Sequence, residues 1–445
     1  MTKAARTLAL ASVIAVAATP ALAAPWVRGF IVDQYEPAFY YGAKAGTMEA
    51  GTDCPKGTTP DNDYNALLKT KWRSDAEIAK VLKPATLEVD GTFNSGREFL
   101  LSAALRYRGF RRDIDTWVNP FAAPDPGMQE VTGKIAEGFD LDNNPRTGFI
   151  SPTGRKGVDN NLYRVMGCGM AYRGKPFSSY LGTRANDKML EGLFGIVIRV
   201  SGTKDPMNDD NAVVEVGYTP ERIIKDPAGK VVPDYSYRIA KAAQYTKLNA
   251  RIKNGVVKME GGADIRMPVF SWFENNRGEI TFHKARLELS LNPDTSLTGL
   301  VGGYIDWRQY YGRDTFDTSS SAGTRETYYH ENQLAKYYAL KRNADGLPDP
   351  KTGQNMGISA AFRLTGVRAY VRDSSQAVTI NEPLSSNAAP TYRALFRKAS
   401  MTAVIIPDPP RRQGEDDEIP APKDKEQQTV RNEEGKSTNG RSSDP

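Results

Sequence analysis

Apolar and polar residues alternate with a period of two along much of the chain, which is typical of half-buried β-strands. The clearest segment is 283–291, which places on one face His283, Ala285, Leu287, Leu289 and Leu291, and on the other Lys284, Arg286, Glu288 and Ser290. Segments of similar character lie at 97–107, 193–200, 212–218, 297–304 and 358–371. A helix is the alternative for 97–107, because Leu and Ala both favour it. Residues 248–259 predict a hairpin around Asn254-Gly255, because this dipeptide accepts positive φ at both turn positions.

Several short strands joined by turns, each with one polar face, predict a mainly β protein. We expect an antiparallel β-sandwich or a jelly-roll-like body with long loops. One helix is expected to interrupt it at 325–342, with Thr324 as cap and Asp345-Gly346 after its end. The expected body spans 85–406, with a division into two packed β subdomains near 235–245 as an option, and a short helix is expected near 74–82.

The two ends of the chain differ from this body. Residues 1–23 have the pattern of a secretory signal peptide: Lys3 and Arg6, an apolar run, and small residues before a cleavage site after Ala23. No later stretch is long and apolar enough to span a bilayer, so a soluble periplasmic or extracellular protein is expected. Residues 407–445 contain almost nothing apolar and predict a disordered tail.

The chain contains two cysteines, Cys54 and Cys168. An exported protein meets an oxidising environment, which favours a disulfide between them, with two separate buried thiols as the alternative. Such a crosslink would attach the N-terminal segment, 24–84, to the body. The net charge of +6 is spread over a long chain. Because an exported protein meets no chromosomal DNA, nucleic acid is not expected as a partner.

A loop rich in oxygen donors runs from Gly138 to Cys168. Its candidate cation ligands are Asp140, Asp142, Asn144, Asp159 and Asn160. A D-x-D-x-N run places alternate side chains toward one point, and Ca²⁺ takes six to eight oxygen ligands. The loop is not an EF-hand, because Pro145 and Ser151 stand where that motif needs glycine and glutamate. The alternative is that these residues only make Asx turns.

Two other acidic stretches are weaker candidates for a metal site: 343–355, with Asp345 and Asp349, and 205–211. The chain has only His283 and His330, which argues against a histidine-ligated metal site. His283 is expected in the core. No G-x-S-x-G, Walker A or H-E-x-x-H motif occurs. Enzymatic chemistry would therefore have to use carboxylates, as glycoside hydrolases do.

These observations favour an exported binding or accessory protein of the cell envelope with a Ca²⁺-stabilised loop and a ligand or protein partner that the sequence does not identify. A carbohydrate-active or other hydrolase with paired carboxylates is the first alternative. A structural envelope component is the second.

Overall fold

The computed structural model describes residues 25–40, 51, 53–59, 86–87, 93–94, 125, 127–169, 172–191, 195–241, 245–259, 261–270, 277–294, 296–315 and 333–375. The expected signal peptide, the helix expected near 74–82, the strand expected at 97–107 and the tail from 407 lie outside these ranges.

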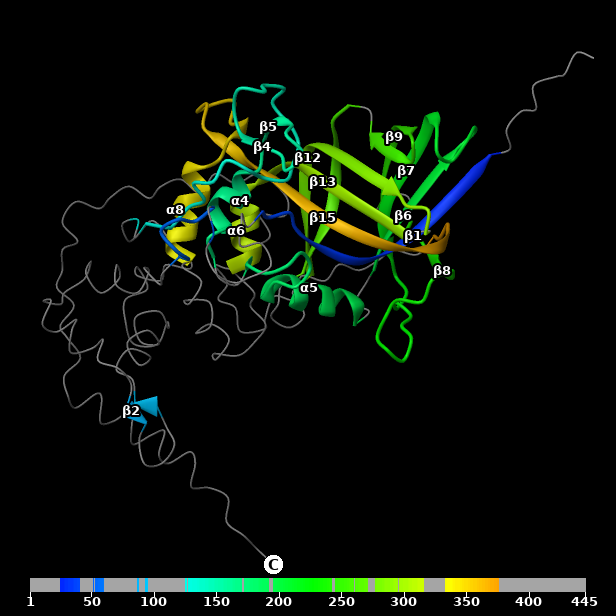
Figure 1. Cartoon of the computed structure of the whole chain (residues 1–445), viewed down its shortest axis with the longest axis horizontal. Coiled ribbons are helices and arrows are strands. Elements are labelled where there is room, and N and C mark those ends of the chain that lie inside the picture. The colour runs from blue at the N-terminus through cyan, green and yellow to red at the C-terminus, as the bar shows by residue number, and fades with distance from the viewer. Residues whose placement is uncertain are drawn as a thin grey trace, which may run out of the picture.

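The main sheet closes into an eight-stranded antiparallel barrel (Figure 1). Its strands, in sheet order, are β1 (Trp26–Pro37), β6 (Gly195–Gly202), β7 (Asp209–Thr219), β9 (Thr246–Lys253), β10 (Val256–Met259), β12 (Arg277–Leu291), β13 (Ser296–Asp306) and β15 (Asn355–Arg372). Closure comes from β15, which pairs with β13 on one side and with β1 on the other. The predicted sandwich or jelly roll is therefore wrong, although the mainly β class is correct.

Alternate residues of each strand point into the barrel, where they form most of the core. Ile198 of β6, for example, lies between Phe30 of β1 and Val216 of β7, and all three are buried. The strands predicted at 212–218, 297–304 and 358–371 are confirmed within β7, β13 and β15, and the strand predicted at 193–200 is confirmed from Gly195 on within β6. The hairpin is confirmed too, since β9 and β10 flank Asn254 and Gly255, which have φ of 52° and 77°.

A bulge changes the phase of β12. His283 pairs with Tyr304 and Arg286 pairs with Gly302, so both Lys284 and Ala285 lie opposite Gly303. As a result Phe282 and Ala285 are both fully buried, and His283 turns outward, where its Nδ1 lies 2.9 Å from Asp264 Oδ2. The core position expected for His283 is wrong, because a single extra residue moves the preceding side chains to the other face.

Shorter strands extend the sheet. They are β11 (Ala263–Phe270) beside β12, β8 (Tyr235–Arg238) parallel to β15, and β14 (Gly346–Pro348) antiparallel to β15. Gly357 of β15 pairs with Asp306 of β13 on one side and with Gly346 of β14 on the other. Strand β14 therefore lies on the same side of β15 as β1, beyond the point where β1 ends. Two small hairpins pair β2 (Thr86–Leu87) with β3 (Phe93–Asn94), and β4 (Phe149–Ile150) with β5 (Lys156–Val158).

The described residues contain four helices, α4 (Asn161–Met166), α5 (Tyr180–Leu190), α6 (Trp307–Thr315) and α8 (Gln333–Arg342), whereas only the helix at 325–342 was expected within the body. Helix α8 confirms the second half of the helix predicted at 325–342. Helices α4, α6 and α8 gather with the β4–β5 hairpin at one end of the barrel, and α5 packs along β1 (Figure 1). None of the helices in the described ranges combines the length and apolar character that a membrane span requires.

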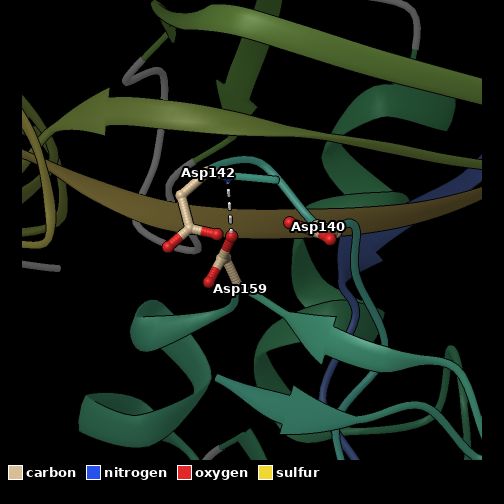
Figure 2. A group of neighbouring side chains, drawn as sticks. All are labelled: Asp140, Asp142 and Asp159. Atoms are coloured by element: carbon tan, nitrogen blue, oxygen red, sulfur yellow. Dashed lines mark hydrogen bonds between the residues drawn. The ribbon is translucent and has the colours of Figure 1, made fainter. Parts of the chain in front are cut away.

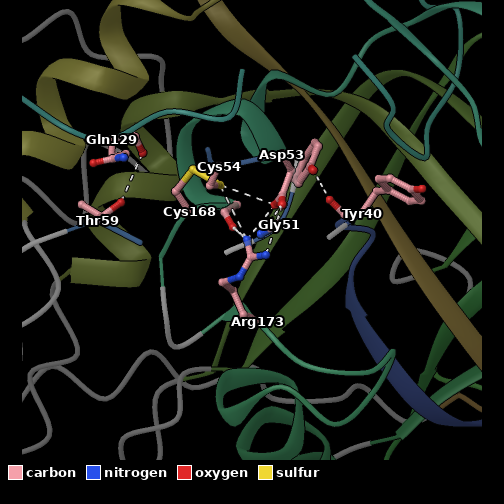
Figure 3. A network of polar contacts seen from close by, with 10 residues as sticks. Tyr40, Gly51, Asp53, Cys54, Thr59, Gln129, Cys168 and Arg173 are labelled. Carbon is pink, nitrogen blue, oxygen red and sulfur yellow. Dashed lines mark hydrogen bonds and ion pairs between the residues drawn. A yellow bond between two sulfur atoms is a disulfide. The ribbon is translucent and has the colours of Figure 1, made fainter. Parts of the chain in front are cut away.

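Cys54 and Cys168 form the predicted disulfide, across 114 residues of sequence. Arg173 lies beside it, fully buried, and its Nη1 donates to Asp53 Oδ2 at 2.6 Å and to the Gly167 carbonyl oxygen at 2.8 Å (Figure 3). A buried charge is tolerated only when paired. This ion pair and the disulfide together attach the segment around Asp53 to the end of α4.

Candidate cation site and adjacent cleft

The acidic loop lies against the outer face of the barrel. Phe139 and Leu141 pack on Tyr304 of β13, with Leu300 and Leu347 at the edge of this small cluster. The contact needs a residue without a side chain at 302, since a Cβ on Gly302 would lie 2.8 Å from Phe139 Cδ2. The loop is therefore held in place by apolar packing on one face, which leaves its polar side chains on the other.

Three carboxylates of this loop converge. One carboxylate oxygen each from Asp140, Asp142 and Asp159 lies within 4.8 Å of the other two, and Figure 2 shows how the three side chains are arranged. Asp140 and Asp142 come from the turn after Phe139, and Asp159 directly follows β5, which brings two stretches of the loop together. Asp159 Oδ2 accepts hydrogen bonds from Leu141 N at 2.7 Å and Asp142 N at 3.3 Å. This arrangement can hold a metal ion.

The electrostatics of the three groups are unfavourable without a cation. None of them forms an ion pair with a lysine, arginine or histidine of the described ranges. Burial, together with the negative charges of Asp142 and Asp140, raises the pKa of Asp159 to about 6, although the two backbone hydrogen bonds oppose this shift. Asp140 Oδ2 and Asp159 Oδ1 accept no hydrogen bond from a described residue, so both oxygens are available to a ligand ion.

The two asparagines of the expected ligand set have other partners. Asn160 is completely buried and caps α4: its Oδ1 accepts from Tyr163 N, and its Nδ2 donates to the carbonyl oxygens of Ala38 and Glu137. Asn144 Oδ1 accepts from Arg146 N at 3.2 Å within the turn. The structure thus groups the three aspartates and gives Asn160 a structural role.

A cleft of about 530 Å³ opens beside the three aspartates. The acidic loop, the bulge of β12, Tyr304 and the β14–β15 hairpin form its walls. Its lining side chains include Leu141, Asp142, Asn143, Lys284, Arg286, Tyr304, Asp345, Leu347, Pro348 and Asn355. Asp142 belongs both to the aspartate group and to the lining, so an ion held by the three aspartates would lie at the edge of the cleft.

Asp345 is, with Asp142, one of the two carboxylates that line this cleft. Its Oδ1 accepts from Ser359 N at 2.7 Å and its Oδ2 accepts from Ser359 Oγ at 2.6 Å. Burial raises the pKa of Asp345 to about 6 despite these bonds, and the charge of Asp159 adds to the shift. Burial and the nearby carboxylates also raise the pKa of Tyr304, so its phenol keeps its proton.

The two weaker acidic stretches do not form comparable groups. In 343–355, Asp349 Oδ1 accepts hydrogen bonds from Lys351 and Thr352, which closes a turn, and Asp345 belongs to the cleft. In 205–211, Asp209 Oδ2 accepts from Thr203 N and Lys204 N. These aspartates organise turns.

Sequence reasoning missed the cleft. In the sequence, Lys284 and Arg286 belong only to the polar face of a predicted strand. Tyr304 lies in another predicted strand, where no adjacent residue marks it as part of a site. The one available signal was Asp345, which already stood out in an acidic stretch. Comparison with protein-family models, with curated proteins and with solved structures finds no match for this chain.

Proposed function

We propose that this chain is an exported binding protein whose acidic loop holds one Ca²⁺ ion next to a ligand cleft. The observation that carries the proposal is the convergence of Asp140, Asp142 and Asp159 within 4.8 Å, without a cationic side chain among the described residues to balance them. The position of Asp142 in both the group and the cleft links the ion to the binding surface.

The donor set favours Ca²⁺ over transition metals. All three groups are carboxylates, which are hard oxygen donors, and they suit Ca²⁺, Mg²⁺ or Mn²⁺ better than Zn²⁺ or Cu²⁺. Ca²⁺ accepts irregular sites with six to eight ligands, some of them water and backbone carbonyl oxygens, whereas Mg²⁺ demands near-octahedral geometry. The group contains three carboxylates and, among the described residues, no fourth one. Such a site fits Ca²⁺ better than Mg²⁺, because Ca²⁺ accepts the more irregular geometry.

The disulfide supports an exported location. A structural disulfide persists in oxidising compartments and is rare in the cytosol. It agrees with the signal-peptide pattern of residues 1–23. A periplasmic or extracellular environment would also supply Ca²⁺ at the concentrations that a modest oxygen site requires.

Thermal unfolding of the mature protein with EDTA, Ca²⁺ or Mg²⁺ tests the ion. Ca²⁺ at about one hundred times its Kd stabilises by about 2.7 kcal/mol. We expect a higher Tm with Ca²⁺, a smaller response to Mg²⁺, and no Ca²⁺ response in Asp140→Asn/Asp142→Asn. The asparagines keep the acceptor oxygens that the Asn144 amide uses, so the variant should fold.

Asp210→Asn is the matched control, because Asp210 is exposed and pairs only with the exposed Lys204. It should respond to Ca²⁺ as the unaltered protein does. A Tm that Ca²⁺ leaves unchanged would refute the calcium site.

A hydrolase is the second candidate, favoured by one observation: the cleft is lined by two carboxylates, Asp142 and Asp345, and the pKa of Asp345 is raised to about 6. A carboxyl group with such a pKa can act as general acid near neutral pH. Assays with chromogenic glycosides and esters test this reading. Turnover that Asp345→Asn abolishes would favour the hydrolase, and turnover unaffected by that change would exclude a role for Asp345.

A further inference from the structure

The charges that remain available in the cleft are positive. Lys284 and Arg286 both line it, and no described carboxylate lies within ion-pair distance of either. Among the described residues, Arg286 Nη1 donates only to the carbonyl oxygens of Ala285 and Lys284, at 3.3 and 3.5 Å. By contrast, both oxygens of Asp345 accept from Ser359, and both oxygens of Asp142 accept hydrogen bonds within the loop. Lys284 and Arg286 are therefore the charged groups of the cleft that lack a partner of opposite charge among the described residues.

The fold holds these cations in place. The bulge of β12 sets Lys284 at a positive φ of 49°, an uncommon conformation for a residue with a side chain. Gly262 also makes room for the guanidinium group, since a Cβ there would lie 2.8 Å from Arg286 Nη1. Bulges often redirect a side chain next to a functional site.

Tyr304 shares the lining of the cleft with the two cations. Tyr304 pairs with His283 on one side and with Ser359 on the other, so it lies between the bulge of β12 and the Ser359–Asp345 pair. Only 5% of this residue is exposed, it lines the cleft, and its hydroxyl has no hydrogen-bond partner among the described residues. The hydroxyl is therefore available to donate to a ligand in the cleft.

The rest of the lining supplies acceptors and a small apolar surface. Asn355 donates to the Ala344 carbonyl oxygen at 3.2 Å, which leaves its own amide oxygen for a ligand. Asn143 and Asp345 also line the cleft, and Leu141, Leu347 and Pro348 add apolar contact. A volume of about 530 Å³ falls within the range of small-molecule sites.

We propose that the cleft binds a small polyhydroxylated molecule that carries one carboxylate or phosphate group, such as an acidic sugar. The anionic group lies on Lys284 and Arg286, with the Tyr304 hydroxyl as a further donor. The hydroxyl groups donate to the oxygens of Asp345, Asn355 and Asn143. A plain dianion fits poorly because the carboxylates of Asp142 and Asp345 also line the cleft. A neutral sugar would leave Lys284 and Arg286 without an anionic partner. The inference rests on the proposed binding function and names its ligand class.

Isothermal titration of the mature chain tests this with four probes: glucuronate, glucose 6-phosphate, glucose and acetate. We expect glucuronate or glucose 6-phosphate to bind at least about tenfold more tightly than glucose and acetate. The better of the two identifies the anionic group. Lys284→Gln/Arg286→Gln should weaken that binding by about tenfold or more.

Lys247→Gln/Lys253→Gln is the control variant, because it removes two charges from exposed positions of β9. It should bind as the unaltered protein does. Tyr304→Phe keeps the packed ring and removes only the hydroxyl, so a folded Tyr304→Phe protein should show weaker binding of the anionic sugar. Equal binding of glucose and glucuronate, no binding of any anionic sugar, or full affinity in Lys284→Gln/Arg286→Gln would each overturn the ligand class.

The titrations are repeated in Ca²⁺ and in EDTA, which separates the two proposals. Binding of an anionic sugar in a protein whose Tm ignores Ca²⁺ would support the ligand class and refute the calcium site. A Ca²⁺-dependent Tm without sugar binding would do the reverse.

Discussion

At the scale of single residues, Asp345 has a carboxyl group whose titration differs between the folded and unfolded protein. Its pKa is about 6 in the native state and 3.8 in an exposed reference state, and burial is the main cause. Between these values the native state binds more protons than the unfolded state. The free energy of unfolding therefore falls as the pH rises from about 4 to about 6.

Asp345→Asn should remove this part of the pH dependence, because an amide does not titrate and still accepts from Ser359 N. We expect the variant to lose less stability than the unaltered protein between pH 4 and pH 7, by at most about 3 kcal/mol. Urea unfolding in EDTA at the two pH values measures the difference. Parallel pH profiles for both proteins would contradict the role given to Asp345.

Asn160→Ala should destabilise the protein by about 2–4 kcal/mol, because it removes a helix cap and leaves two buried carbonyl oxygens without a donor. Since Asn160 serves the helix rather than the ion, the loss should be equal in EDTA and in Ca²⁺. Urea unfolding under both conditions checks this. A larger loss in Ca²⁺ would instead make Asn160 part of the cation site.

Residue types predicted part of the site. The density of aspartate and asparagine in 138–168 identified the loop, and three of its five expected ligands converge. The sequence could not separate Asn160 from them, since an asparagine that caps a helix and one that binds a cation look alike until their partners are known. Lys284, Arg286 and Tyr304 could not be selected either, because their importance comes from strand register and a bulge.

At the scale of secondary structure, the alternation of apolar and polar residues predicted where strands lie, but not which face each side chain occupies throughout a strand. In 283–291 the pattern is regular from Ala285 to Leu291, and the bulge at Lys284 and Ala285 reverses the faces before it. A bulge adds one residue without altering the local composition, so periodicity alone does not reveal it. The cationic wall of the cleft depends on that one extra residue.

Gly302→Ala should loosen the acidic loop from the barrel. The added methyl group would meet the Phe139 ring and the Ala360 carbonyl oxygen, at a cost of about 1–3 kcal/mol. We expect a lower Tm and faster proteolysis within 138–159. Phe139→Leu, which opens space at the ring, should restore part of the stability when combined with Gly302→Ala. An unchanged Tm would show that the loop does not depend on this contact.

At the scale of the whole molecule, closure of the sheet decides between barrel and sandwich. Both folds have strands with one buried and one polar face, so the pattern of each strand is the same. What differs is the pairing of β1 with β15, which joins residues more than three hundred positions apart, as in Gly29 with Ala369. No local feature of either segment encodes that contact, and 26–37 was not predicted as a strand.

Replacement of both cysteines by alanine should lower the free energy of unfolding by about 5 kcal/mol, because the disulfide closes a loop of 114 residues in the unfolded chain. Urea unfolding of the oxidised protein, the reduced protein and the double variant measures this. The last two should unfold at the same, lower urea concentration. A midpoint that reduction leaves unchanged would show that the surrounding packing, including the Arg173–Asp53 pair, suffices.

The seam between β1 and β15 also determines how the barrel responds to mechanical force. The two strands run antiparallel, so the start of β1 at Trp26 and the end of β15 at Arg372 lie at the same end of the seam. Tension applied between these points would load the hydrogen-bonded pairs one after another instead of all together. We expect the barrel to unzip from this seam at low force in an optical trap, and to resist much more strongly when pulled across β13 and β15 from opposite ends.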